Sequence, residues 1–160
     1  MTIQIGDKLP QITVSTMTPE GPKPVSLEEL CSGKKVVLFA VPGAFTPTCS
    51  VQHLPGFVTN ASALKEKGAD VVACISVNDP FVMAAWGKEG NTGEDVLMLA
   101  DGNAEFTSAI GLEMDGTGFG LGKRSQRYAM IIDDGVVSTL NVESGPALDV
   151  SSAETILETL

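Results

Sequence analysis

The sequence predicts an α/β protein with a mixed central sheet flanked by helices. Two apolar, β-branched stretches, Lys35–Val41 and Asp70–Val77, have the composition of strands buried on both faces, as in parallel sheets. Helical spacing over Cys49–Lys67 joins them into a βαβ unit. Near the C-terminus, Asp133-Asp134-Gly135 separates two further apolar stretches and indicates a tight antiparallel hairpin. We therefore expect both parallel and antiparallel strand pairs.

The residues before the first buried strand predict two short elements. Between Ile3 and Val25 the apolar residues alternate with polar ones, and Thr18–Pro22 has the composition of a turn, so we expect a small hairpin. Ser26-Leu27-Glu28-Glu29 is a capping-box pattern. It should start a short helix that ends near Gly33.

The long helix after the first buried strand is expected to begin at Cys49. Pro47 and Thr48 form an N-terminal signal, with Thr48 as the capping residue, so the thiol of Cys49 should lie in the first turn. The unpaired N–H groups and the positive dipole at that end favour a thiolate over a thiol. Pro55-Gly56 predicts a kink or a division of this helix, and Gly68 its end.

The second half of the chain predicts alternating helices and strands. Their expected places are a helix from the cap Asn78-Asp79-Pro80 to about Glu89, a strand Val96–Ala100, a helix capped by Asp101 or Asn103 and ending near Gly111, hairpin strands Tyr128–Ile132 and Val136–Val142, and a helix from Ser151-Ser152-Ala153-Glu154 to Leu160. A βαβ unit followed by a hairpin and a terminal helix is the order of the thioredoxin-like fold.

Size and composition narrow the function classes. The 160 residues are enough for one domain, which we expect to cover residues 1–160. The net charge of −10 argues against nucleic-acid and membrane partners, and no apolar run approaches the length of a membrane span. The start of the chain lacks the features of a signal peptide, which predicts a cytoplasmic protein. Three cysteines without Cys-x2-Cys spacing predict reduced thiols rather than a zinc site or a disulfide scaffold.

Cys49 is the strongest candidate for a reactive residue. Its position at a helix start, after two prolines and a threonine, suits ionisation better than packing in a core. Ionisation alone adds little to the rate, because a less basic thiolate is also a weaker nucleophile. A fast enzyme therefore needs donors aimed at the charge that develops on the substrate. Thr46 and a later arginine are the candidates for these groups.

Pro42, Thr46 and Cys49 form a Pro-x3-Thr-x2-Cys pattern inside Pro-Gly-Ala-Phe-Thr-Pro-Thr-Cys-Ser. With this pattern the chain resembles the peroxiredoxins, and specifically the type II, peroxiredoxin-5-like branch, from Ile5 to the final helix. The resemblance implies a thiol peroxidase in which the thiolate of Cys49 attacks hydrogen peroxide or an alkyl hydroperoxide and becomes a sulfenic acid. It implies no metal, flavin or haem cofactor, and it implies a homodimer.

The same resemblance assigns roles around Cys49. Thr46 would accept a hydrogen bond from the peroxide and hold the thiolate, and Pro42 would shield the thiolate without a competing N–H. The Arg-Tyr-Ala-Met strand start matches the position of the family's active-site arginine, so Arg127 would stabilise the thiolate and the charge that passes along the O–O bond. Arg124 is left as a surface or interface residue.

His53 follows Cys49 by four residues and shares its helix face, a spacing that also occurs in Cys-His dyads and metal sites. Neither is supported, because the sequence offers no orienting acid with oxyanion donors and no clustered metal ligands. The family carries His-Leu-Pro-Gly-Phe after its cysteine. We therefore expect His53 to be a structural residue or to support the site from behind.

Cys74 has two open interpretations. Its strand position, some way below the sheet edge where Cys49 should lie, favours a core residue, since a disulfide needs Cα atoms within about 7 Å. Plant-like type II peroxiredoxins often carry a cysteine here, which makes it a candidate resolving cysteine. The peroxiredoxin-5 subtype uses a cysteine near the C-terminus, where this chain has Ala147–Ser151. Cys31 is expected to be incidental, and Gly116–Gly122 to be a flexible loop near the site or a dimer contact, since it lacks phosphate-binding context.

Without a dependable resolving cysteine, the sulfenic acid on Cys49 should be reduced by glutaredoxin with glutathione, or by thioredoxin. Two other classes stay open at this point. A redox sensor or binding protein with the same fold would keep the reactive cysteine but turn over peroxide slowly. A cysteine hydrolase would act on esters or amides instead.

Overall fold

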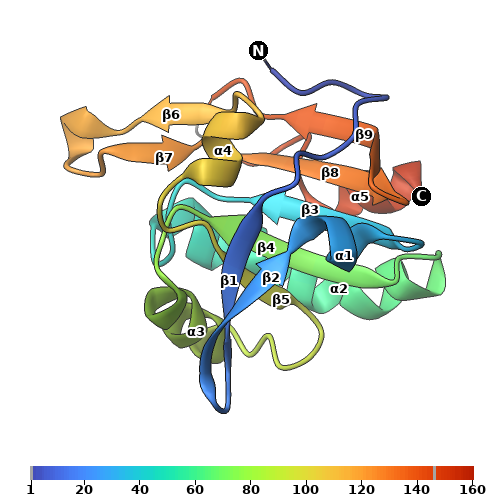
Figure 1. Ribbon diagram of the computed structural model, residues 1–160, viewed down its shortest axis with the longest axis horizontal. Coiled ribbons are helices and arrows are strands. Elements are labelled where there is room, and N and C mark those ends of the chain that lie inside the picture. Colours follow the sequence, from blue (N-terminus) through green and yellow to red (C-terminus); the bar gives the residue numbers. More distant parts are fainter. Residues whose placement is uncertain (1, 146) are drawn as a thin grey trace.

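The computed structural model describes residues 2–145 and 147–160 as an α/β fold around a mixed seven-stranded sheet (Figure 1). The strand order is β2-β1-β5-β4-β3-β8-β9, and β6 and β7 form a separate two-stranded sheet. The strands are β1 (Thr13–Thr18), β2 (Gly21–Ser26), β3 (Lys35–Ala40), β4 (Val71–Ser76), β5 (Leu97–Ala100), β6 (Glu113–Asp115), β7 (Lys123–Ser125), β8 (Tyr128–Asp133) and β9 (Val136–Val142). The α-helices are α1 (Leu27–Cys31), α2 (Leu54–Glu66), α3 (Pro80–Glu89), α4 (Glu105–Ala109) and α5 (Ala153–Thr159), with a π-helical segment at Cys49–His53 and a 3₁₀ turn at Thr117–Phe119.

The sheet confirms the predicted mixture of pairings. β3 pairs in parallel with β4, and β4 with β5, whereas β8 runs antiparallel to both β3 and β9. The predicted hairpin turn has Asp134 and Gly135 at positive φ, 49° and 81°, as a two-residue hairpin loop requires. The sequence order predicted for a thioredoxin-like fold is therefore the order observed.

Each face of the sheet carries its own core. Helices α2, α3 and α5 pack on one face, around the stacked rings of Phe39 and Phe57. Helices α1 and α4 and the N-terminal segment cover the other face, around Leu38 and Phe106. The central strands β3 and β4 are buried on both faces, which explains why their sequences are almost continuously apolar.

Capping residues set the predicted helix starts. Ser26 accepts a hydrogen bond from the N–H of Glu29, Asp79 from that of Val82, and Ser152 from that of Thr155. Asp101 caps α4 from a distance, since its carboxylate accepts from the N–H groups of residues 106 and 107.

One prediction along the chain was wrong in detail. The long helix divides before Pro55 rather than at it: the N–H of Leu54 bonds to the carbonyl of Cys49, which widens one turn. This widening fits the proline, which lacks an N–H and crowds the preceding turn. The stretch Gly116–Gly122 forms the turn of the β6–β7 hairpin, where the N–H of Gly116 donates to the carbonyl of Gly122 at 2.7 Å.

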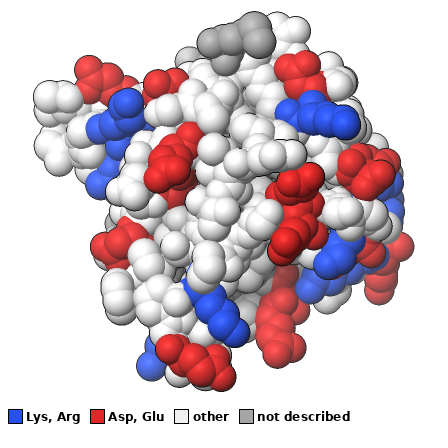
Figure 2. All heavy atoms as spheres, viewed as in Figure 1, with Lys and Arg blue, Asp and Glu red and all other residues white. Residues whose placement is uncertain are grey.

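Charged side chains of both signs are dispersed over the face of the molecule shown in Figure 2. On the face shown in Figure 2, acidic side chains are spread widely and basic ones lie among them without forming a continuous basic patch. Among the described residues, no helix has both the length and the apolar character needed to cross a bilayer.

Candidate active site

The loop after β3 brings Cys49 to the carboxyl end of the central strands. The backbone is already helical at Pro47, and the first helical bond runs from the N–H of Ser50 to the carbonyl of Thr46, 2.9 Å. The predicted cap at Thr48 is wrong, because Thr48 has helical backbone angles and its side chain makes no capping bond. The helix starts at the proline, whose fixed φ suits the first helical position. Cys49 still lies in the first turn, as predicted.

The register of β3 and β8 brings Arg127 close to the loop that carries Cys49. In the antiparallel β3–β8 pair, Ala40 at the end of β3 lies opposite Tyr128 at the start of β8. Arg127 therefore sits at the sheet edge from which the Cys49 loop departs. Its Nη2 donates to Sγ of Cys49 at 3.1 Å, and both residues are buried, with Arg127 only 7% exposed. The predicted juxtaposition of the thiol and this guanidinium is present.

A cavity of about 640 Å³ opens beside this pair. It is lined by Pro42, Thr46, Pro47, Thr48, Glu113, Met114, Phe119, Gln126, Arg127, Glu143, Ser144 and Gly145. Cys49 has no exposed surface and is not part of this wall. Because Arg127 both lines the cavity and contacts the sulfur, Sγ lies one hydrogen bond behind the wall. A small molecule in the cavity would be in reach of Arg127, Thr46 and Pro42, the three predicted site residues in its wall.

The hydroxyl of Thr46 is directed by its own loop. It donates to the carbonyl of Gly43 at 2.7 Å, so its hydrogen is committed and its oxygen is left to accept. This geometry agrees with the expected role of Thr46 as an acceptor for a peroxide O–H. It does not provide a hydrogen bond from Thr46 to the thiolate, the other half of the expected role.

Arg124 is more than the surface or interface residue we expected. Its Nε donates to the carbonyl of Leu121 at 3.0 Å, and Nη1 reaches the carbonyl of Pro42 at 3.4 Å. A Cβ on Gly43 would lie 2.8 Å from Nη1, so this glycine lets the guanidinium approach the loop. Arg124 thus fastens the β6–β7 hairpin to the loop that precedes Cys49.

Two polar residues that sequence reasoning missed hold the same loop from the other side. Oδ1 of Asn78 accepts from the N–H of Ala44 at 3.0 Å and from the hydroxyl of Ser76 at 2.7 Å. The Ser76 hydroxyl also lies 3.1 Å from the carbonyl of Val41. Their place at the carboxyl end of a buried parallel strand was the available signal, because such ends meet at one edge of a sheet.

His53 lies behind Arg127 and is 1% exposed. Its Nε2 is 2.9 Å from the carbonyl of Ser151, and its Nδ1 is 3.0 Å from Nη1 of Arg127. A carbonyl only accepts and a guanidinium only donates, so the ring carries its hydrogen on Nε2 and accepts through Nδ1. Burial, and next the charge of Arg127, lower the pKa of His53 to about 3. With both nitrogens engaged, His53 has no free position for a Cys49 dyad or a metal ion.

Acid is expected to destabilise the fold through His53. The unfolded chain takes up a proton near the ordinary pKa of 6.5, whereas the folded chain does so only near its pKa of about 3. The free energy of unfolding should therefore fall as the pH decreases between these values, by about 1.4 kcal/mol per pH unit from this group. Urea titrations across this interval should show a shallower pH dependence for His53→Gln than for the wild type. Parallel profiles would contradict the assignment.

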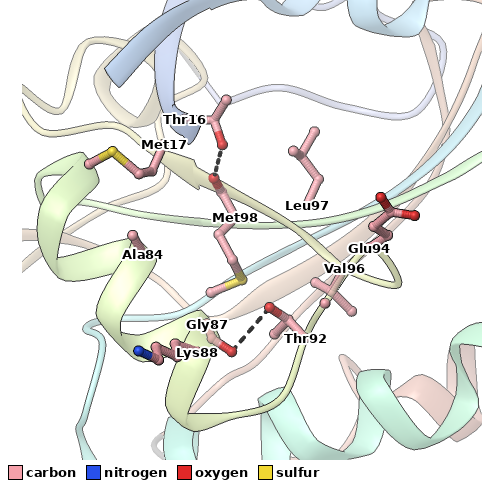
Figure 3. Close-up of a pocket in the computed structure, with 11 residues that line it drawn as sticks. Thr16, Met17, Ala84, Gly87, Lys88, Thr92, Glu94, Val96, Leu97 and Met98 are labelled. Carbon is pink, nitrogen blue, oxygen red and sulfur yellow. Dashed lines mark hydrogen bonds between the residues drawn. The ribbon is translucent and has the colours of Figure 1, made fainter. Parts of the chain in front are cut away.

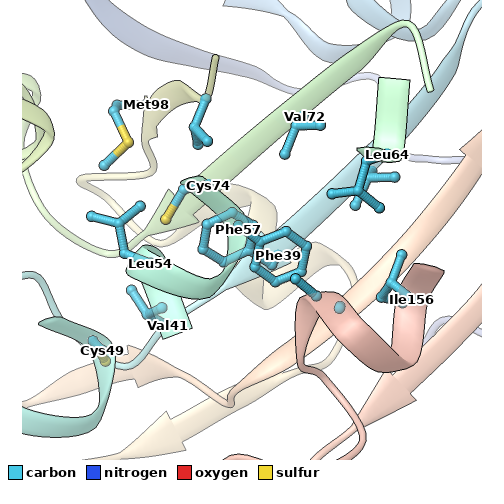
Figure 4. Packing of buried hydrophobic residues seen from close by; sticks show 14 of the residues in the cluster. Phe39, Val41, Cys49, Leu54, Phe57, Leu64, Val72, Cys74, Met98 and Ile156 are labelled. Carbon is cyan, nitrogen blue, oxygen red and sulfur yellow. The ribbon is translucent and has the colours of Figure 1, made fainter. Parts of the chain in front are cut away.

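The other two cysteines are buried thiols away from the cavity. Cys74 pairs with Phe39 in the β3–β4 ladder and faces the same core as Cys49, as Figure 4 shows. Burial raises the pKa of the Cys74 thiol well above its usual range, and burial raises that of Cys31 to about 11. All three cysteines are unbridged. The position of Cys74 favours the core interpretation.

A second cavity, of about 440 Å³, lies between α3, β1 and β5 (Figure 3). Its polar groups bond within the protein: Thr16 donates to the carbonyl of Met98, and Thr92 to that of Gly87. None of the predicted site residues lines it. In residues 2–145 and 147–160, no three His, Cys, Asp or Glu side chains cluster as a metal site would need.

Comparisons with known proteins identify the family of the chain. The family model described as Redoxin matches residues 4–157. The chain is 53% identical to "Peroxiredoxin-2E, chloroplastic" of Arabidopsis thaliana, over 99% of this chain and 70% of that protein. It is 50% identical to "Peroxiredoxin-2B" of the same plant, over 99% and 98%.

Solved structures give the same result. Reduced Prx3 from Vibrio vulnificus, in complex with H₂O₂, superposes with a TM-score of 0.95 at 60% identity, over 99% of both chains. Peroxiredoxin 5 from Alvinella pompejana superposes with a TM-score of 0.86 at 37% identity, over 98% of this chain and 97% of that one. The chain therefore belongs to the Redoxin family and, within it, to the type II peroxiredoxins, so it is a thiol-dependent peroxidase.

Proposed function

We propose that Cys49 is the peroxidatic cysteine and that it reduces hydrogen peroxide and alkyl hydroperoxides with the help of Arg127, Thr46 and Pro42. One observation carries this proposal: Arg127, which lines the large cavity, places its Nη2 3.1 Å from the buried Sγ of Cys49. The peroxide binding reported for the Vibrio vulnificus Prx3 complex supports the same substrate class here.

The chemistry requires one displacement. The thiolate of Cys49 attacks the terminal oxygen of the hydroperoxide, so that an S–O bond forms as the O–O bond breaks. Cysteine becomes a sulfenic acid, and the leaving oxygen takes a proton from solvent and departs as water or an alcohol. Arg127 would stabilise the charge that passes to this oxygen, and its Nε, buried without a hydrogen-bond partner among the described residues, is free to donate to substrate.

Thr46 and Pro42 would place the peroxide. The Thr46 oxygen, whose hydrogen is donated to the carbonyl of Gly43, would accept from the peroxide O–H and so hold the terminal oxygen toward Sγ. Pro42 has no N–H that would compete for the thiolate. Since Cys49 has no exposed surface, the substrate would approach from the cavity with a small shift of these side chains.

The intact mass of the protein after one equivalent of peroxide tests this function. We expect the gain of one oxygen atom in the wild type and in the Cys31→Ser and Cys74→Ser variants, and no gain in Cys49→Ser. A loss of two hydrogens in the wild type, absent from Cys74→Ser, would instead identify a disulfide between Cys49 and Cys74. An unchanged mass in the wild type would contradict the proposed peroxidatic role.

We further propose that an external thiol, glutaredoxin with glutathione or thioredoxin, reduces the sulfenic acid. Cys74 is fully buried in the β3–β4 ladder, and burial raises the pKa of its thiol, so it is poorly placed to attack. We propose the cytoplasm as the compartment of the protein, because thiols stay reduced there. We also propose that the protein is a homodimer, in which exposed rings such as those of Phe45, Phe81 and Phe119 would become buried. Cell fractionation and sedimentation velocity would test these last two points.

The Cys74→Ser variant is expected to retain most of its glutaredoxin-supported peroxidase activity, because Cys74 takes no part in the proposed cycle. Its free energy of unfolding should fall by about 1–3 kcal/mol, since a hydroxyl replaces a thiol in an apolar core. Steady-state assays with each reductant, below the unfolding transition, provide the measurement. Loss of activity in the folded variant would make Cys74 the resolving cysteine.

A further inference from the structure

A closed ring of hydrogen bonds connects Glu143, in the wall of the cavity, with Arg127 and the buried His53. The backbone N–H of Glu143 donates to the carbonyl of Arg127 at 2.9 Å. The carboxylate of Glu143 accepts from the N–H of Ser151 at 2.8 Å and from its hydroxyl at 2.6 Å. The carbonyl of Ser151 accepts from Nε2 of His53, and Nδ1 of His53 accepts from Nη1 of Arg127. The ring thus begins at the backbone of Arg127 and returns to its guanidinium.

Each bond in this ring has only one possible direction. The carboxylate can only accept from Ser151, and the Ser151 carbonyl can only accept from His53. His53 must then hold its hydrogen on Nε2 and present the bare Nδ1 to Arg127. Nη1 of Arg127 is therefore fixed, which leaves Nη2 aimed at Sγ of Cys49. Each group between Glu143 and the thiol of Cys49 therefore has an assigned role as donor or acceptor.

Glu143 is suited to anchor the ring. The same carboxylate oxygen also accepts from the N–H of Asp149 at 2.8 Å, so one side chain fixes the turn that leads to α5. Burial favours the neutral form of Glu143, but the hydrogen bonds from Ser151 and Asp149 outweigh it and lower the pKa of this carboxyl. The acceptor is therefore charged at neutral pH, and its hydrogen bonds are of the strong, charge-assisted kind.

We propose that Glu143 and Ser151 are positioning residues for the peroxidase reaction, which hold the guanidinium of Arg127 on Cys49 by fixing the tautomer and orientation of His53. This inference rests on the proposed roles of Cys49 and Arg127. Neither Glu143 nor Ser151 contacts the sulfur, and both act through His53. Loss of the anchor leaves the helix start around Cys49 in place but releases Arg127.

A single histidine makes the test direct, because the chain contains only His53. With ¹⁵N-labelled histidine, NMR distinguishes the protonated from the bare ring nitrogen, and the wild type should show only the Nε2–H form. Glu143→Ala should give a mixture of tautomers. It should also slow the single-turnover reaction of Cys49 with hydrogen peroxide by about tenfold, the effect expected for losing one charge-assisted hydrogen bond.

Alkylation of Cys49 by iodoacetamide separates positioning from general loss of structure. This reaction needs the thiolate but places no negative charge on an oxygen, so its rate in Glu143→Ala should stay within about twofold of the wild type. Glu143→Gln keeps one acceptor oxygen, so its rate with hydrogen peroxide should lie between those of Glu143→Ala and the wild type. Glu158→Ala removes an equivalent charge from the exposed face of α5 and is the matched control.

Two results would overturn the inference. One is an unchanged His53 tautomer together with an unchanged peroxide rate in Glu143→Ala. The other is an equal loss of peroxide and iodoacetamide reactivity, which indicates a structural role alone. If Glu143→Ala does not fold, Glu143→Gln and Ser151→Ala are judged by the same two measurements. A wild type that does not consume peroxide would refute the proposed function. The tautomer measurement would still show whether the hydrogen-bond ring holds His53 as described.

Discussion

Replacement of Cys49 by serine is expected to abolish peroxide turnover. The serine hydroxyl stays protonated at neutral pH, so no anion is present beside Arg127 to attack the O–O bond. The loss should reach the background rate of the buffer, because Cys74 and Cys31 are buried thiols whose pKa values burial has raised. Peroxide consumption with saturating glutaredoxin and glutathione provides the measurement.

Cys31→Ser is the matched control for this experiment. Cys31 lies at the end of α1 in the core on the opposite face of the sheet, so its replacement should leave turnover unchanged. Far-ultraviolet circular dichroism of both variants shows whether each is folded. Turnover by folded Cys49→Ser above a small fraction of the wild-type rate would mean that another thiol reacts with peroxide.

The second large effect is expected for Arg127→Ala, which should lower the rate of peroxide reduction by at least about 100-fold. Removal of one preorganised donor to a developing oxyanion typically costs 10²- to 10³-fold. Arg127 is a charged donor in a buried site, where such interactions are strong. Stopped-flow measurement of a single turnover isolates this step from the later reduction by glutaredoxin.

Two further variants define the cause of that loss. Lys123→Ala removes an exposed cation from the neighbouring strand β7 and should leave the rate unchanged. Arg127→Lys keeps the charge but cannot bond His53 and Cys49 at once, so it should recover only part of the rate. A rate for Arg127→Ala within tenfold of the wild type would show that the thiolate reacts with peroxide without the guanidinium.

Much of the fold was predictable because the strongest patterns coincide with the most buried elements. The continuous apolar runs of β3 and β4 identified the parallel pair, and Asp134-Gly135 identified the hairpin. The β6–β7 hairpin was missed because its three-residue strands enclose a glycine-rich turn without alternating hydrophobicity. The π-helical segment before Leu54 has no sequence period of its own and depends on how the helix accommodates Pro55.

The site was predictable where the chain carries a local pattern. Pro42, Thr46 and Cys49 are close in sequence, and the strand start at Tyr128 located Arg127. The groups that hold these residues were not predictable, because they meet only through the tertiary structure. Glu143 reaches Ser151 beyond the end of β9, and Ser151 reaches His53 across 98 positions of the chain. No spacing rule connects residues so far apart.

Arg124 illustrates the same limit. The sequence places two arginines three positions apart and gives no physical means to assign a separate contact to each. Only the β6–β7 register turns Arg124 toward the carbonyl of Pro42, while Arg127 enters the core beside Cys49.

The central claim is that Arg127 directs the reactivity of Cys49 toward the O–O bond, beyond what ionisation of the thiol provides. The most direct test measures two rate constants for the wild type, one for the reaction of Cys49 with hydrogen peroxide and one for its reaction with iodoacetamide. Each is divided by the rate constant of free cysteine thiolate with the same reagent. We predict that the ratio for peroxide exceeds the ratio for iodoacetamide by several orders of magnitude and that Arg127→Ala removes most of this excess. Equal ratios in the wild type would contradict the account.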